Sequence, residues 1–191
     1  DTLLGEKHIY GIGPVEGLKG EITIYDDMVS VSTIENERPM VGNAKNTKAI
    51  FLIKAHQEDW EEIRIDSTLS GLDAIETFVE EALVKKSLDT EMGYPFRIEA
   101  KVPSLDYHII FKTDTLPHDM EQHKRAKRKF TLENVPVRII GFWVNRQRMG
   151  KLTHNGKRTH SHFIASDNST SGHIDDVVIP KSAKLFLPKK E

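Results

Sequence analysis

The sequence predicts an α+β protein with mixed or antiparallel β-sheets and one main helix. Segments with strand-like alternation or short apolar runs recur along the whole chain, whereas long helical periodicity occurs once, at residues 70–88. An all-parallel sheet would require more helices to connect its strands. We expect 191 residues to form one domain or two tightly packed β-rich halves. Residues 1–95 would then carry the main helix, and residues 96–191 the candidate metal site.

The first half begins with a glycine-rich stretch, GIGPVEGLKG at residues 11–20. It predicts a loop that brings the backbone close to another segment and leads to Glu21. Residues 21–33 alternate in polarity on either side of an Asp-Asp pair, which predicts a β-hairpin. Residues 49–57 start with a continuous apolar run, so we expect a strand that is buried on both faces.

The main helix is predicted at residues 70–88, where Ser70 and Asp73 indicate a side-chain cap at its start. Its apolar residues recur at helical spacing and form one stripe, namely Ile75, Phe78, Val79, Ala82 and Leu83. Such a stripe is typical of a helix that packs on a core. We therefore assign this helix a structural role and no chemistry.

The second half is predicted to consist of strands joined by loops. The segments with strand character are residues 96–102, 106–113, 135–144, 160–166 and 173–179. Residues 118–130 are polar and basic, and we expect a solvated connection there. An anion or nucleic-acid patch is the other interpretation of these basic residues, but the whole chain has a formal net charge of −2. General nucleic-acid binders are usually strongly basic, so no nucleic-acid partner is expected.

The composition also limits the chemistry. The chain contains no cysteine, so a metal site must use His, Asp or Glu side chains. No apolar run approaches the about 20 residues that span a bilayer, so we expect a soluble protein without a membrane partner. The sequence starts without Met or a leader-like segment. The compartment therefore stays unknown: cytoplasmic, or exported after removal of a leader.

The segment THSHFIASDNSTSGHID, residues 159–175, predicts a metal site. On a strand, His160 and His162 point to the same face. A turn centred on the following Asp-Asn pair would place His162 opposite His173, with His160 diagonal to it. Three imidazoles on one patch with an open fourth position are typical of a catalytic divalent metal, most naturally Zn²⁺. The alternative is chance clustering in a polar hairpin.

Ordinary surface or core positions are expected for the other histidines, which are His8, His56, His108, His118, His123 and His154. Asp175 lies on the predicted histidine face of its strand. It is a candidate for orienting a ligand imidazole as a hydrogen-bond acceptor.

Four segments, in the same order, resemble motifs of the α-acetolactate decarboxylase family. They are GIGPVEGLKGEITIYD, MGYPFRIEA, FTLENVPVRIIGFW and HSHFIASDNSTSGHIDD. The matches extend from about residue 10 to residue 176. The last segment is the most specific of the four, because it contains the spaced histidines.

This resemblance implies an acetolactate-decarboxylase-like fold and a metal-dependent decarboxylase that converts acetolactate to acetoin in the butanediol pathway. His160, His162 and His173 match the family's metal ligands, and the cofactor would be Zn²⁺ or another divalent first-row metal. Glu21 matches an active-site glutamate, and Leu18 matches a leucine that lines the substrate pocket. The substrate would be a small molecule. Family members are often dimers, so a homodimer is also an expectation.

The sequence departs from the family pattern at three places. Asp114 stands where the family has an arginine that would grip the substrate carboxylate, and Pro14 replaces a small hydroxyl residue. Only 18 residues follow His173, so we expect no equivalent of the family's C-terminal glutamate. Two alternatives therefore stay open: a non-catalytic homologue that binds a metal or small ligand, and a different metal-assisted reaction, such as an isomerisation. Arg97 matches a family element but receives no catalytic role.

Overall fold

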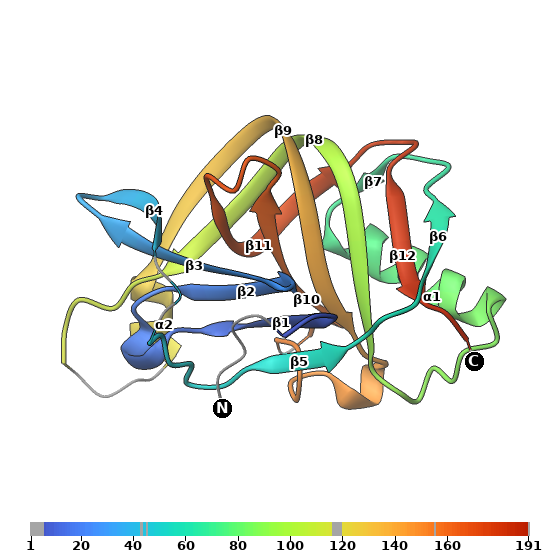
Figure 1. Cartoon of the computed structure of the whole chain (residues 1–191), viewed down its shortest axis with the longest axis horizontal. Coiled ribbons are helices and arrows are strands. Elements are labelled where there is room, and N and C mark those ends of the chain that lie inside the picture. The colour runs from blue at the N-terminus through green and yellow to red at the C-terminus, as the bar shows by residue number, and fades with distance from the viewer. Residues whose placement is uncertain (1–5, 43, 45, 116–119, 155, 191) are drawn as a thin grey trace.

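The computed structural model describes residues 6–42, 44, 46–115, 120–154 and 156–190. These residues form two antiparallel sheets with few helices, which confirms the predicted α+β class (Figure 1). The five-stranded sheet has the order β4 (Arg38–Gly42), β3 (Met28–Glu35), β2 (Glu21–Asp26), β1 (Ile9–Pro14) and β5 (Ile53–His56). The seven-stranded sheet has the order β6 (Trp60–Arg64), β12 (Lys184–Pro188), β8 (Tyr94–Ile110), β9 (Lys127–Trp143), β10 (Thr159–Ala165), β11 (Ser171–Ile179) and β7 (Leu69–Ser70).

The helices are short apart from α1 (Leu72–Lys85). The others are α2 (Met120–Ala126) and the 3₁₀ turns η1 (Glu16–Leu18) and η2 (Arg146–Arg148). None of the helices in the described ranges is long and apolar enough to cross a membrane.

The long strands β8 and β9 organise the seven-stranded sheet. Each has 17 residues, and the two pair along almost their whole length. Strand β8 also pairs with β11, so β8, β9, β10 and β11 form a closed cycle of pairings. This closure brings residues of β8 next to residues of β11 that are more than 60 positions later in the chain.

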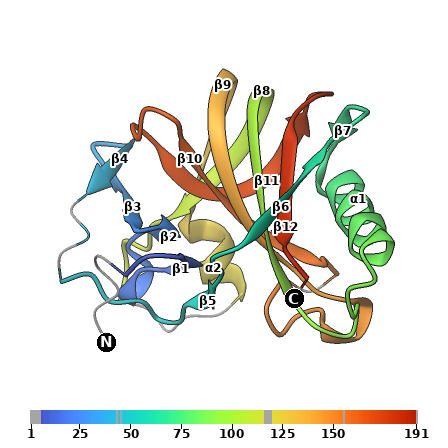
Figure 2. The same cartoon turned by 45° about the vertical axis from the view of Figure 1, so that its right-hand side comes forward.

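The two sheets and α1 form layers. In Figure 2, the five-stranded sheet lies on one side of the seven-stranded sheet and α1 lies on the other. Successive side chains of β9 point to opposite faces of the seven-stranded sheet. Ile139 therefore packs in the cluster that contains residues of α1, and Ile140 packs in the cluster that contains Tyr10 and Tyr25 of the five-stranded sheet.

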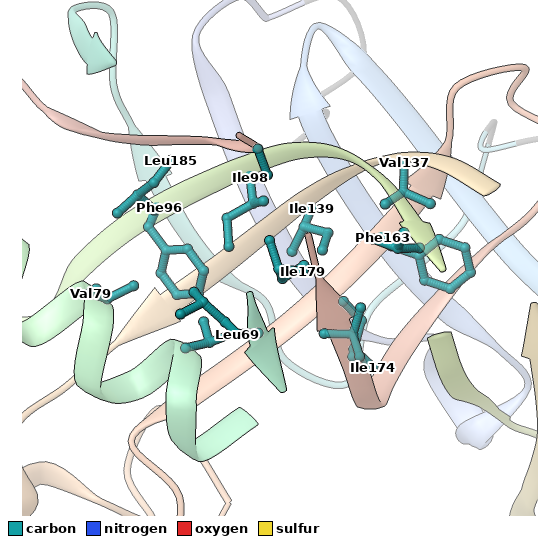
Figure 3. Packing of buried hydrophobic residues seen from close by; sticks show 14 of the residues in the cluster. Leu69, Val79, Phe96, Ile98, Val137, Ile139, Phe163, Ile174, Ile179 and Leu185 are labelled. Atoms are coloured by element: carbon teal, nitrogen blue, oxygen red, sulfur yellow. The ribbon is translucent and has the colours of Figure 1, made fainter. Parts of the chain in front are cut away.

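The main core lies between α1 and the seven-stranded sheet. Figure 3 shows Val79 of α1 facing Leu69 and Phe96, with Ile98, Ile139, Ile179 and Leu185 behind them. The predicted stripe is confirmed, since Ile75, Val79, Ala82 and Leu83 are buried and Phe78 is partly buried. The predicted side-chain cap is wrong. Gly71 is the N-cap residue, its φ of 86° favours glycine, and no side chain caps the helix.

The glycine-rich segment is only partly a loop. The predicted loop is wrong for residues 11–14, which belong to β1 and pair with β2, while Gly11 and Ile12 also pair with β5. The expected close backbone approach is present, because a Cβ atom on Gly13 would collide with the carbonyl oxygen of Phe51. Glycine therefore permits tight strand packing here, and the turn follows at η1, where Gly17 has a φ of 70°.

Other predicted boundaries also change. The hairpin at residues 21–33 is confirmed as β2 and β3. The strand predicted at 49–57 covers only Ile53–His56, and its alternating burial shows that it is not buried on both faces. It is an edge strand in the described part of the sheet, so one face stays in contact with solvent.

In the second half, the strands predicted at 96–102 and 106–113 form one continuous strand, β8, which ends at Ile110, so the second prediction is wrong for residues 111–113. Residues 118 and 119 of the predicted basic connection lie outside the described ranges. The rest of 118–130 forms α2 and the start of β9, so the prediction of a solvated connection is wrong for these residues. Charged side chains on the exposed face of β9 conceal its strand pattern in the sequence.

The division into residues 1–95 and 96–191 stays a prediction. In the structure, β6, β7 and α1 come from the first of these ranges and lie on the seven-stranded sheet.

Candidate metal centre

Three histidines occupy neighbouring positions on adjacent strands. His162 of β10 is directly opposite His173 of β11, which confirms the predicted register. His173 is in turn opposite His108 of β8. Directly opposite residues of antiparallel strands share a face, so these side chains form a row across three strands. His160, two residues before His162, lies on the same face of β10.

The predicted trio of imidazoles converges. The ring centroids of His160 and His173 are 4.9 Å apart, and those of His162 lie 5.5 Å from His160 and 5.3 Å from His173. Nε2 of His160 and Nδ1 of His173 are 3.1 Å apart. Two nitrogens bound tetrahedrally to Zn²⁺ at about 2.0–2.1 Å would be about 3.3 Å apart, so this spacing is suitable for one shared ion.

Contacts behind the rings leave ligand nitrogens directed into the cluster. Nδ1 of His160 donates to the carbonyl oxygen of Leu152 at 3.3 Å, so in the neutral ring Nε2 carries the lone pair. Nδ1 of His162 is hydrogen-bonded to Thr23 Oγ1 at 3.0 Å. Nε2 of His162 is buried and has no hydrogen-bond partner among the described residues. Such an atom costs about 1–3 kcal/mol, and a metal ion would satisfy it.

The three rings are in the form that binds metals. Burial, together with the nearby imidazoles, lowers the pKa of His160 to about 3. Burial also holds the pKa values of His162 and His173 well below the ordinary value, with neighbouring histidines adding to the effect. All three are therefore neutral near pH 7, and neutral imidazole is the ligand form. The residues present fit a divalent metal.

Two histidines that were expected to lie elsewhere join this cluster, so that expectation is wrong for them. The ring of His108 is 4.4 Å from that of His173, and the ring of His154 is 5.0 Å from both His160 and His173. Their positions depend on strand pairing and on a loop, and the sequence carries no pattern for either.

Two groups have ligand atoms that all lie within 4.8 Å of one another. One consists of His154, His160 and His173, and the other of His108, His173 and Asp175. His162 belongs to neither group, although its ring completes the predicted trio.

Asp175 does orient an imidazole, but it is that of His108. Its Oδ1 lies 2.9 Å from His108 Nδ1 and 3.8 Å from Lys127 Nζ. The hydrogen bond from His108 and the positive charge of Lys127 favour the ionised carboxylate of Asp175. The pKa of Asp175 is therefore lowered, although partial burial acts in the opposite direction. The candidate role of Asp175 thus applies to a histidine outside the predicted trio.

Glu21 lies beside the histidines as a buried acid. Its Oε1 accepts a hydrogen bond from the backbone N–H of Ile110 at 3.2 Å, and its Oε2 is 3.9 Å from Nε2 of His162. Burial raises the pKa of Glu21 to about 8. Near pH 7 both Glu21 and His162 are therefore neutral, and the pair is a carboxylic acid beside an imidazole, not an ion pair.

Leu18 lies close to the same acid. It is buried against Ile110 and Ala126, and its carbonyl oxygen accepts a hydrogen bond from Lys112 N at 2.8 Å. Because Ile110 also binds Glu21 through its N–H, Leu18 and the carboxyl group share one structural neighbour. Asp114 is further along this segment, where its carboxylate is 3.4 Å from Lys112 Nζ.

Arg97 is not part of the histidine cluster. Its guanidinium lies 4.6 Å from the ring centroids of Trp60 and Phe186 and donates to Tyr10 at 3.3 Å. It serves the contact between the sheets, in agreement with the absence of a catalytic assignment.

The sequence profile of the family described as alpha-acetolactate decarboxylase matches residues 4–189. The chain belongs to the alpha-acetolactate decarboxylase family. A search of curated protein sequences finds no significant match.

Solved structures agree with this family membership. Acetolactate decarboxylase from Bacillus subtilis subspecies spizizenii is 17% identical, with a TM-score of 0.74 over 97% of this chain and 75% of that one. A Staphylococcus aureus protein of unknown function, described as similar to alpha-acetolactate decarboxylase, is 13% identical, with a TM-score of 0.74 over 98% of this chain and 75% of that one. At these identities the likeness shows the acetolactate decarboxylase fold alone.

Proposed function

We propose that this protein is a metal-dependent decarboxylase of a 2-hydroxy-3-keto acid, with α-acetolactate as the substrate and acetoin and CO₂ as the products. The observation that carries the proposal is a buried carboxylic acid, Glu21, beside converging neutral imidazoles, one of which has a buried nitrogen without a hydrogen-bond partner in the described part of the chain. Membership of the family supports the same reaction class.

His160, His162 and His173 would hold the metal. An all-imidazole set suits Zn²⁺, and it also accepts other divalent first-row ions. When bound, the ion supplies a Lewis acid that draws electron density from the oxygen atoms of the substrate next to the bond that breaks. The contacts of His160 with Leu152 and of His162 with Thr23 orient both rings before any ligand arrives.

Glu21 would act as the proton donor. When the bond between the substrate carbon and its carboxylate breaks, CO₂ leaves and the electron pair stays on that carbon. The Glu21 carboxyl then gives its proton to this carbon, which completes acetoin and leaves a carboxylate that regains a proton from solvent. The hydrogen bond from Ile110 N fixes the side-chain orientation, so the proton is delivered to one face.

Leu18 and Ile110 would form an apolar wall of the substrate pocket near this acid. Both are buried, and they pack against each other. An apolar wall keeps water away from the carbon that carries the electron pair, and it keeps the Glu21 carboxyl protonated. Leu18 is thereby proposed as a substrate-binding residue.

The proposal is tested by acetoin release from racemic α-acetolactate with zinc-loaded protein. We expect Glu21→Gln to lower kcat about 10²–10⁴-fold while zinc content stays the same. His162→Ala should lower both zinc content and turnover. His56→Ala, which removes a histidine on β5 far from this cluster in sequence, is the matched control and should change neither. Turnover by the native protein no higher than that of His162→Ala would overturn the proposal.

The alternatives from the sequence can be separated in the same assay. A non-catalytic homologue would bind zinc and release no acetoin, and an isomerase would convert the hydroxy-keto acid without releasing CO₂. The family comparison does not favour the non-catalytic reading. A homodimer is also proposed, and sedimentation velocity would measure it.

A further inference from the structure

We propose that His154 is an additional ligand of the metal, supplied at the exposed mouth of the site by the connection between η2 and β10. This inference rests on the proposed metal site. It assigns a metal-binding role to a residue that the sequence motifs of the family do not contain.

The geometry of the rings supports His154 as strongly as it supports His162. The centroids of His154, His160 and His173 form a triangle with sides of 5.0, 5.0 and 4.9 Å. The corresponding triangle with His162 in place of His154 has sides of 5.5, 5.3 and 4.9 Å. The ligand atoms of His154, His160 and His173 also all lie within 4.8 Å of one another. His154 is therefore at least as close to the shared His160–His173 pair.

The residues before His154 are tied to the cluster. The preceding Leu152 carbonyl accepts the hydrogen bond from His160 Nδ1, which ties the connection to a proposed ligand. Thr153 Oγ1 donates to the carbonyl oxygen of Lys157 at 2.6 Å, and Lys157 N donates to the carbonyl oxygen of His154 at 3.0 Å. These contacts of Leu152, Thr153 and His154 connect the segment that carries the imidazole to the start of β10.

Exposure distinguishes His154 from the other rings. His160 and His173 are buried, whereas His154 is exposed. A ligand at the solvent side can complete the coordination of the resting ion and can move without disturbing β10 or β11. Zinc sites tolerate a change from four to five ligands, so an incoming substrate oxygen need not displace the buried imidazoles.

The competing group, His108 with His173 and Asp175, is less suitable. Asp175 already accepts from His108 at 2.9 Å, and Lys127 Nζ lies 3.8 Å from the same oxygen. A divalent ion there would have to compete with both groups for the same carboxylate oxygen. His108 and Asp175 are better explained as a hydrogen-bonded support beside His173.

The test is metal affinity and the Co²⁺ spectrum of His154→Ala compared with the native protein. We expect His154→Ala to bind Zn²⁺ about 10–100-fold more weakly in competition with a chromophoric chelator, as for loss of a metal-orienting or ligating group. The visible bands of the Co²⁺ form should shift and change in intensity, because one nitrogen donor is replaced by water. His154→Ala is expected to fold normally, since the side chain is exposed.

The matched control is His123→Ala. The ring of His123 is 6.5 Å from that of His154, so the variant removes a second imidazole from the same neighbourhood. We expect its Zn²⁺ affinity and Co²⁺ spectrum to equal those of the native protein. Unchanged affinity and spectrum in His154→Ala would overturn the inference and leave the proposed function intact. Failure of the native protein to bind Zn²⁺ or Co²⁺ would overturn both.

Discussion

The His108 imidazole donates from Nδ1 across 2.9 Å to the carboxylate of Asp175, two residues after His173 on the same strand. Burial lowers the pKa of His108, and the carboxylate partly offsets this effect. We therefore expect Asp175→Asn to lower the pKa of His108 further in the metal-free protein, because the imidazolium loses its negative partner. NMR titration of the imidazole signals measures this. Asp176→Asn, which alters the neighbouring exposed carboxylate, should leave the His108 titration unchanged.

Glu21 predicts a dependence of stability on pH. Its pKa is raised from 4.5 to about 8, so between these values the folded metal-free protein keeps a proton that the unfolded chain releases. The contribution of Glu21 to the free energy of unfolding should therefore fall as the pH rises from 4.5 to 8, with a slope of up to about 1.4 kcal/mol per unit, opposite in sign to the contribution of the three buried histidines. Urea denaturation of native protein and Glu21→Gln should show this slope in the native protein alone. Parallel pH profiles for the two proteins would contradict the assignment.

Metal binding should stabilise the folded chain. At a free Zn²⁺ concentration about 100 times Kd, the gain is about 2.7 kcal/mol, because the ion binds the folded state preferentially. For a chain of this size, we expect the Tm to rise by about 5–10 °C. Removal of the ion with a chelator should reverse the shift. An equal rise in His162→Ala would show that zinc binds elsewhere.

Glu76 connects α1 to the start of β10. Its Oε1 accepts hydrogen bonds from Arg158 N at 2.8 Å, Thr159 N at 3.1 Å and Thr159 Oγ1 at 3.2 Å. We expect Glu76→Ala to cost about 3–5 kcal/mol of unfolding free energy, because buried donors and Arg158 lose their acceptor. Urea denaturation measures the loss. Glu81→Ala, on an exposed position of α1, is the control and should change stability by less than about 0.5 kcal/mol.

The tight packing around Gly141 of β9 predicts that a larger side chain there lowers the stability of the protein. A Cβ atom there would collide with the Phe96 ring and lie 2.6 Å from Ser161 Oγ, between His160 and His162 in sequence. We expect Gly141→Ala to cost about 1–3 kcal/mol through overpacking. Gly42→Ala, where the nearest atom would be at an ordinary 3.7 Å, should change stability by less than about 1 kcal/mol. Thermal unfolding of both variants compares them, and equal losses would contradict the packing argument.

Much of the fold follows from local sequence patterns. The stripe of α1, the hairpin of β2 and β3, and the register of His162 with His173 were predictable because each depends on nearby residues. Strand β1 was not predictable in this way. Its Gly13 is needed because the backbone of Phe51 comes very close to it, and this contact exists only in the folded chain. The start of β9 was missed because its polar side chains weaken the strand periodicity.

The same distinction applies to the candidate site. His160, His162 and His173 lie on one hairpin, so their spacing alone predicts that they meet. His108 reaches the cluster through pairing of β8 with β11, and His154 reaches it from the segment whose Leu152 carbonyl oxygen binds His160. Both contacts depend on tertiary structure, for which a single sequence carries no direct signal.

The acid and the imidazoles belong to different sheets. Thr23 of β2 meets His162 of β10, and Ser30 of β3 meets Ser171 of β11 at 2.8 Å, so these seam contacts fix how one sheet sits on the other. A slight sliding of the sheets would change the distance from the Glu21 carboxyl to the histidines while leaving each sheet intact. The Ser30–Ser171 contact is thereby able to influence the spacing of the acid and the imidazoles without touching either of them.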